Sequence, residues 1–141
     1  MSDLGTSLLS QAVAVGLLRD VTRIEHIRRG ELGDRLAVLA DSLERQLPDW
    51  SWKAPRGGLA LWARLPEGSA TELAHVARRH GVAIVPGSVM SPTGSYDDFV
   101  RLPIDHEPHV LEEGVRRLAL AWSSYRTTAR ERAGLRLDVV V

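Results

Sequence analysis

The sequence has no cysteine, a single lysine and no excess of either charge. Without cysteine there can be no disulfide, thiolate zinc site or cysteine nucleophile, so a metal ion could be bound only by histidine and carboxylate side chains. Lysine plus arginine and aspartate plus glutamate each number 18. This balance provides no long-range field that would draw the chain to DNA, RNA or an anionic membrane, and we expect no direct contact with nucleic acid.

Long hydrophobic runs are also missing. The chain opens with the acidic Met1-Ser2-Asp3, and its first apolar stretch is interrupted by Ser10, Gln11 and Arg19. Such a segment is not typical of a secretory signal or a membrane span, so we expect a cytoplasmic protein without membrane contact. With 141 residues, 44% of them hydrophobic, the chain is long enough to bury one core, and one globular domain is expected.

Helical periodicity appears in four segments. The first is apolar around most of its circumference, which predicts a helix buried on several sides. Ser69 and Glu72 match a capping box for the third, and Pro108 is typical of the first turn of the fourth. Gly114 inside the fourth costs roughly 1 kcal/mol relative to alanine. The predicted helices cover residues 6–18, 32–47, 70–80 and 108–125.

Alternating apolar and polar residues predict strands between these helices. Residues 88–98 are polar and rich in turn formers, which favours a loop, and residues 127–141 read either as an added edge strand or as a disordered tail. Helices and strands in this order predict an α+β two-layer sandwich, with a small, mainly antiparallel sheet covered by helices on one face. The predicted strands cover residues 50–52, 59–65, 82–85 and 99–104.

One face of this sheet would combine aromatic and cationic side chains. Successive strand residues point to opposite faces, so Phe99 and Arg101 lie together on the face away from the core. Trp62 and Arg64 occupy the corresponding positions of their own strand. Something could dock on such a face, although an arginine there is usually a solvated residue and a tryptophan is more often part of the core.

Other groupings of reactive side chains are weaker. His106 and His109 straddle a helix start without a third ligand, so no metal site is predicted, and the other histidines are expected on the surface. The pair Asp97-Asp98 fits solvated loop residues better than a general acid and base. The glycines at 57, 58 and 87 lie outside any phosphate-binding pattern. No catalytic, cofactor-binding or metal-binding residue is therefore predicted in this chain.

Three motifs in order resemble the C-terminal small domain of class I and II pyridoxal-phosphate aminotransferases. The resemblance covers residues 6–125, and the segments Leu9-Ser10-Gln11-Ala12-Val13-Ala14 and His26-Ile27-Arg28-Arg29 look like the family's helices that leave the large domain and enter the small one. The three motifs are Pro55-Arg56-Gly57-Gly58-Leu59-Ala60-Leu61-Trp62, Gly81-Val82-Ala83-Ile84-Val85-Pro86-Gly87 and Phe99-Val100-Arg101-Leu102.

By this resemblance, Arg101 corresponds to the arginine that binds the α-carboxylate of the substrate or effector, which suits a guanidinium fork. The lysine that holds the cofactor belongs to the family's large domain, and Lys53 has no such role here. The resemblance therefore implies pyridoxal phosphate in a full-length parent, none in this chain, and no transaminase activity of the chain alone. Gly57-Gly58 serves either a close domain contact or a simple turn. Met90 stands where the family commonly has phenylalanine.

The resemblance also implies a domain organisation and partners. Residues 1–47 would link from the large domain, residues 48–126 would form the small domain, and residues 127–141 the tail. The partners would be that large domain or a second subunit, with a homodimer as one form, and an amino-acid-like carboxylate.

Within this superfamily, the run Leu111-Glu112-Glu113-Gly114-Val115-Arg116-Arg117-Leu118 with Ala121-Trp122 looks most like MocR-type regulators of the GntR family. These join a winged-helix DNA-binding domain to an aminotransferase-like effector sensor. An effector-sensing domain is thus the leading hypothesis. Two alternatives are the small domain of a true aminotransferase and a stand-alone interaction or dimerisation module.

Overall fold

The computed structural model of the chain describes residues 7–137, and the side chains of residues 7–129. The chain divides into two compact units between Asp34 and Arg35. The boundary was expected at residue 47, but Leu39, Leu43 and Leu47 are buried in the core of the second unit. Among the described residues, none of the helices is both long and apolar enough to cross a membrane.

The first unit is helical. α1 (Leu8–Arg19) begins after Ser7, whose hydroxyl accepts the Ser10 N–H at 3.5 Å, and α2 (Val21–Gln46) follows. The predicted burial of the first helix is wrong for the described part of the chain, because α1 contains no buried residue. Its large apolar side chains and those of the start of α2 are exposed: Leu8, Leu9, Val13, Val15, Leu17, Leu18, Val21, Ile24 and Ile27.

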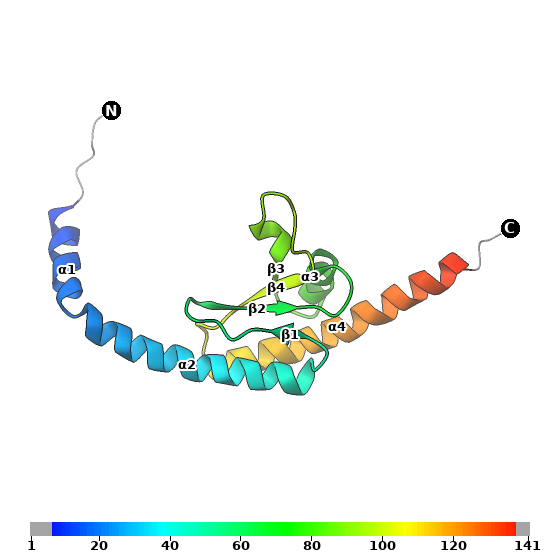
Figure 1. The fold of residues 1–141 in the computed structure, drawn as a ribbon, viewed down its shortest axis with the longest axis horizontal. Coiled ribbons are helices and arrows are strands. Elements are labelled where there is room, and N and C mark those ends of the chain that lie inside the picture. Colours follow the sequence, from blue (N-terminus) through cyan, green and yellow to red (C-terminus); the bar gives the residue numbers. More distant parts are fainter. Residues whose placement is uncertain (1–6, 138–141) are drawn as a thin grey trace, which may run out of the picture. The chain divides into compact units, whose positions relative to one another are not determined.

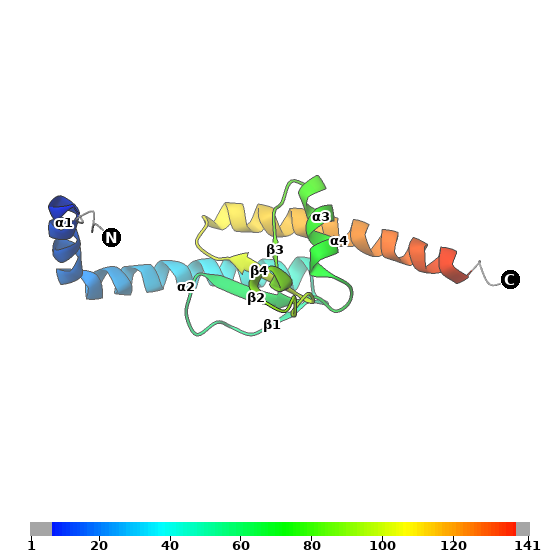
Figure 2. The same ribbon diagram turned by 90° about the horizontal axis from the view of Figure 1, so that it is seen from above.

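The second unit is a four-stranded antiparallel sheet with helices on one face (Figures 1 and 2). The strand order is β1-β2-β4-β3, so the two longer strands lie in the middle. The elements that follow α2 are β1 (Ser51–Trp52), β2 (Ala60–Arg64), α3 (Ala70–Arg79), β3 (Val85–Pro86), the short 3-10 helix η1 (Gly87–Met90), β4 (Phe99–Pro103) and α4 (Pro108–Leu137).

The core lies between the sheet and the helices. In β2 and β4 the burial alternates, so that Leu61 and Ala63 face the same layer as Val100 and Leu102. α4 and the last turns of α2 run along this face (Figure 1). The predicted α+β two-layer sandwich is confirmed. The helices contribute these buried apolar residues: Leu39, Leu43, Leu73, Ala77, Leu111, Val115, Leu118, Ala121, Trp122 and Tyr125.

The edge strand is shorter than predicted. The expected strand at residues 82–85 is reduced to β3, which pairs with β4 only through Val85 with Arg101 and Pro86 with Val100. Continued pairing would bring the backbone opposite Pro103. The N–H of Ile104 points towards β2 and donates to the carbonyl oxygen of Leu59, the residue before β2, so an N–H at position 103 would point to β3. Proline has none, and the ladder ends there.

Two further expectations were wrong. Residues 127–137 are neither an edge strand nor a disordered tail, because α4 continues through them to Leu137, and residues 138–141 lie outside the described part. The predicted loop at residues 88–98 also contains most of η1. A strongly charged stretch of good helix formers extends a helix whose first turns are already packed, since propagation costs far less than nucleation.

The N-terminus of α3 is capped through α4. The Ser69 hydroxyl accepts the Glu72 N–H at 3.1 Å, as the capping box predicts. The return bond does not form. Instead, the Ser69 N–H donates to the Tyr125 hydroxyl at 3.0 Å, and that hydroxyl donates to the Glu72 carboxylate at 3.3 Å. Tyr125 is therefore inserted into the cap and links α3 to α4, which burial of its ring makes possible.

Candidate functional site

Three side chains form a row across the face of the sheet that the helices leave open. The strand register pairs Trp62 of β2 with Arg101 of β4, and Arg101 with Val85 of β3. Directly opposed residues point to the same face, with Cβ atoms about 4.5–5.5 Å apart. Trp62 and Val85 are 39% and 36% exposed, and Arg101 is half-buried between them. The arginine predicted as a carboxylate ligand thus lies between two apolar neighbours.

Aromatic rings and an ion pair form the neighbouring row. The Nε of Arg64 donates to the Asp98 carboxylate at 2.7 Å, and the guanidinium of Arg64 lies 5.8 Å from the centre of the Phe99 ring. The rings of Trp62 and Tyr96 approach Phe99 edge-on, with centres 6.4 and 6.1 Å away. The charge of Arg64 is therefore balanced, and the rings form a continuous aromatic surface.

Arg101 has no such partner. No hydrogen bond or ion pair joins its guanidinium to any residue in the part of the chain that the structure describes. A guanidinium offers five N–H donors in a planar fork, and two of them match the two oxygens of a carboxylate. Arg101 therefore combines partial burial with donors that no described residue occupies, which makes it the candidate anion ligand of this face.

Asp97 anchors the loop that precedes β4. Its carboxylate accepts hydrogen bonds from the Ser69 hydroxyl at 2.5 Å, the Thr71 N–H at 3.1 Å and the Ser88 hydroxyl at 2.9 Å, and also from the Thr71 hydroxyl. Burial raises the pKa of Asp97, but these hydrogen bonds from Ser69, Thr71 and Ser88 together outweigh it and hold the pKa below its usual value. The ionised Asp97 thus joins α3, η1 and the start of β4.

Gly87 and the backbone of Tyr96 lie against this aromatic surface. Gly87 is buried at the start of η1, and a Cβ there would lie 3.1 Å from the Trp62 ring and would clash with the Tyr96 carbonyl oxygen. Tyr96 has φ 67°, the left-handed region, which costs an ordinary residue about 1–2 kcal/mol. Since strain of this kind persists only where the surroundings determine it, the loop backbone at Tyr96 is held in one conformation close to Gly87.

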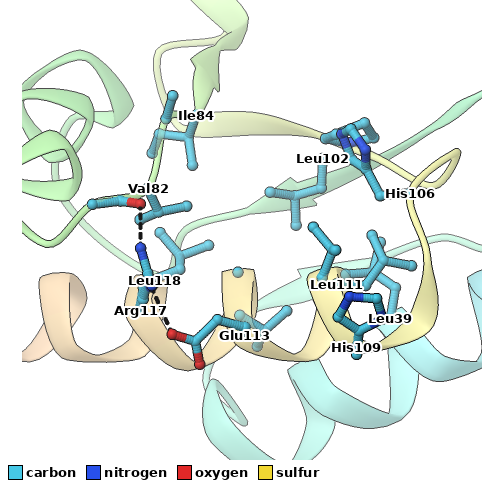
Figure 3. Close-up of a pocket in the computed structure, with 16 residues that line it drawn as sticks. Leu39, Val82, Ile84, Leu102, His106, His109, Leu111, Glu113, Arg117 and Leu118 are labelled. Carbon is cyan, nitrogen blue, oxygen red and sulfur yellow. Dashed lines mark hydrogen bonds and ion pairs between the residues drawn. The ribbon is translucent and has the colours of Figure 1, made fainter.

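A separate cavity of about 410 Å³ lies on the other side of the sheet (Figure 3). Apolar side chains such as Leu39 and Leu102 line it, and Arg117 spans its wall, with hydrogen bonds to the Gly81 carbonyl oxygen at 3.0 Å and to Glu113 at 2.7 Å. Hydrogen bonds from Arg116 and Arg117 lower the pKa of Glu113 to about 2. The cavity therefore has an apolar interior, with the Glu113 carboxylate and Arg117 paired at its wall.

His106 and His109 line this cavity, but they do not form part of a metal-binding cluster. In the part of the chain that the structure describes, no group of three or more histidine, aspartate or glutamate side chains could hold a metal ion.

A substitution of Gly114, which also lines the cavity, tests whether this wall has room for a side chain. A Cβ at this position would contact nothing within 4 Å, and the residue lies in the interior of α4. Gly114→Ala is therefore expected to raise the free energy of unfolding by about 0.5–1 kcal/mol, since alanine is the better helix former. Urea denaturation measures this gain. Destabilisation by the substitution would contradict the open space described for this wall.

The described residues do not by themselves fit pyridoxal phosphate. The single lysine, Lys53, directly follows the edge strand β1, which β2 separates from the strand of Arg101. Gly58 has φ 90°, and a Cβ at Gly57 or Gly58 would contact nothing within 4 Å, which fits a turn and shows no close approach within this chain. The described residues therefore include one candidate carboxylate ligand, Arg101, and none of the groups that would hold the cofactor.

Sequence reasoning found part of this site and missed part of it. It placed Trp62, Arg64, Phe99 and Arg101 on one face, which the register confirms. It took Asp97-Asp98 for solvated loop residues, which was wrong for Asp97, because three side chains donate hydrogen bonds to its carboxylate. Asp98 forms an exposed ion pair with Arg64. The role of Tyr96 was missed, since only its backbone conformation brings its ring to Phe99.

Comparison with known proteins identifies the family of this chain. Residues 2–118 match the family described as aminotransferase class I and II. A 2-aminoadipate transaminase from Thermus thermophilus is 33% identical over 127 residues, which covers 85% of this chain and 31% of that protein. An aromatic-amino-acid aminotransferase from Thermococcus litoralis is 33% identical over 122 residues, covering 83% of this chain and 29% of that protein.

Solved structures agree. An α-aminoadipate aminotransferase from Thermus thermophilus, solved with N-(5'-phosphopyridoxyl)-L-leucine, matches with a TM-score of 0.78 and 30% identity, covering 89% of this chain and 33% of that one. A multiple substrate aminotransferase from Thermococcus profundus matches with a TM-score of 0.75 and 29% identity, covering 89% and 32%. The chain thus spans about a third of the length of the proteins that it matches. It belongs to the aminotransferase class I and II family.

Proposed function

We propose that this chain is the carboxylate-binding part of a pyridoxal-phosphate-dependent aminotransferase-like domain, in which Arg101 binds the α-carboxylate of an amino acid. The observation that supports this most directly is the half-buried guanidinium of Arg101, which has no partner in the described chain. Arg64 on the same face is already paired with Asp98. The cofactor, and the chemistry it supplies to the amino group of a bound amino acid, belong in this proposal to the rest of the parent.

The binding role of Arg101 can be measured on the 141-residue chain. Arg101→Gln is expected to weaken binding of a simple carboxylate such as propionate by about 10- to 100-fold, since a hydrogen bond to a charged group contributes roughly 1.5–3 kcal/mol. Arg101→Lys should recover only part of this loss, because an ammonium cannot form the two parallel bonds of the fork. NMR titration of the backbone amide of residue 101 reports the affinity in every variant.

Arg64→Gln is the matched control. It removes the other strand arginine of the same face, whose charge Asp98 already balances, and carboxylate binding should remain. Equal weakening by both substitutions would show that general positive charge attracts the anion and that Arg101 has no specific role.

The parent is either an enzyme or a regulator. The relatives named above are described as aminotransferases, which favours an enzyme. The regulator hypothesis, an effector-sensing domain of a GntR-family protein of the MocR type, depends on the run at residues 111–122 alone. The encoded sequence upstream of this chain discriminates between them: a winged-helix DNA-binding domain there supports the regulator, and a segment of the aminotransferase large domain directly preceded by a start codon supports the enzyme.

The exposed apolar side chains of the first unit are part of the same proposal. A helix with no buried residue and many large apolar side chains needs a covering surface, which we assign to the large domain of the parent or to a second subunit. The chain alone is then expected to self-associate as its concentration rises, which light scattering measures. Replacing Leu9, Val13 and Leu17 by glutamate should yield a monomer with unchanged helix content. A wild-type chain that stays monomeric up to about millimolar concentration would contradict this assignment.

A further inference from the structure

The row of Trp62, Arg101 and Val85 presents one cation between two apolar side chains. The three residues are paired by register, so a carboxylate bound at Arg101 would place the rest of its molecule directly beside the indole or the isopropyl group. Trp62 is 39% exposed, so part of its indole is accessible at the strand position paired with Arg101.

The charges on this face discriminate against a second carboxylate. The strands present two cations there, Arg64 and Arg101, and the first is held by Asp98 at 2.7 Å. A ligand with an acidic side chain would find no further unpaired cation on these strands, so its second carboxylate would lose hydration without gaining a partner. An unpaired charge of this kind disfavours the wrong ligand.

The aromatic surface is arranged before a ligand arrives. Phe99 is in edge-on contact with both Trp62 and Tyr96, and the close approach of Gly87 leaves the indole little freedom to turn. A binding surface held in place loses little conformational entropy when a flat side chain packs against it. Aromatic groups gain further from the edge-on or offset geometry that such a surface offers.

We infer that the ligand bound by Arg101 carries an aromatic side chain that packs against Trp62, so that the site prefers aromatic 2-amino or 2-oxo acids to aliphatic and dicarboxylic ones. This inference rests on the proposed function, because Arg101 must bind the carboxylate first. Trp62 is then a specificity-determining residue, and Arg101 supplies the affinity common to all carboxylates.

The test compares three carboxylates with the isotope-labelled 141-residue chain: 3-phenylpropanoate, hexanoate and glutarate. The backbone amide of residue 101 serves as the probe, because it is present in every variant. 3-Phenylpropanoate is expected to bind about 3- to 10-fold more tightly than either of the other two, from the gain typical of aromatic pairs. Trp62→Leu should bring the ratio of the affinities for 3-phenylpropanoate and hexanoate close to one, and Trp62→Phe should retain the preference.

Leu120→Ala is the control for the fold and the probe. Leu120 is exposed on α4, and its substitution should leave the ratio of affinities unchanged. Near-ultraviolet circular dichroism of each variant reports whether the core is intact.

The outcomes distinguish the aromatic preference from the carboxylate-binding role of Arg101. Equal affinities for the three carboxylates, all of them weakened in Arg101→Gln, would overturn the aromatic preference and leave the proposed function in place. Unchanged affinity for 3-phenylpropanoate in Arg101→Gln would overturn the proposed role of Arg101. The absence of a saturable shift with any carboxylate would overturn both.

Discussion

Leu61→Ala is expected to lower the free energy of unfolding by about 3 kcal/mol, because it removes a fully buried side chain and leaves a cavity in the core. Its neighbour in β2, Trp62, points to the opposite face and is 39% exposed. Trp62→Ala should therefore cost less, about 1–2 kcal/mol, through lost cross-strand contacts and the partial burial of the ring. Urea denaturation of both variants measures the difference.

Leu61 and Trp62 are neighbours in β2 that point to opposite faces, so the two variants together test the two-layer arrangement. The larger side chain is expected to contribute less, in contrast to what residue volume alone would predict. A greater loss for Trp62→Ala than for Leu61→Ala would mean that the helices cover the other face, and the face of Arg101 would then be core.

Asp97→Ala is expected to cost about 2–3 kcal/mol, since it removes a carboxylate that accepts hydrogen bonds from three side chains and one backbone N–H. The control is Asp98→Ala, which breaks an exposed ion pair with Arg64 and should cost less than about 1 kcal/mol. Thermal denaturation at neutral pH compares the two variants.

The contribution of Asp97 should also depend on pH. Its pKa in the folded chain is lower than the ordinary value of 3.8, so its stabilisation is complete above that value and is lost as the pH falls through the lower folded pKa. The difference in melting temperature between the wild type and Asp97→Asn should therefore be constant from neutral pH to about pH 5 and shrink in stronger acid. A difference that grows in acid would mean that the protonated carboxyl is the form that the fold stabilises.

Periodicity and local signals predicted the layers of this fold well. The alternation in residues 99–104 was enough to place Val100 and Leu102 in the core and Arg101 on the other face, because the period of a strand is fixed by its backbone. Ser69 and Glu72 located the start of α3 for a similar reason, since a helix N-terminus must satisfy its first N–H groups locally.

The errors arose where distant residues decide the structure. Pro103 shortens a strand that lies before it in the sequence, and only the register shows that the two positions face each other. Asp97 looks like a solvated loop residue until α3 and η1 bring Ser69, Thr71 and Ser88 around it. The free guanidinium of Arg101 could be anticipated only through the family resemblance, because periodicity cannot tell which of two arginines on a face is paired.

The cap shared by Ser69 and Tyr125 makes one helix depend on another during folding. The N–H of Ser69 is protected from exchange with solvent only while the Tyr125 hydroxyl is in place, and the two residues lie 56 positions apart in the sequence. Opening of α4 near Tyr125 would therefore release the first turn of α3 in the same event. The amide protons of these two segments are expected to exchange with deuterium as one cooperative unit.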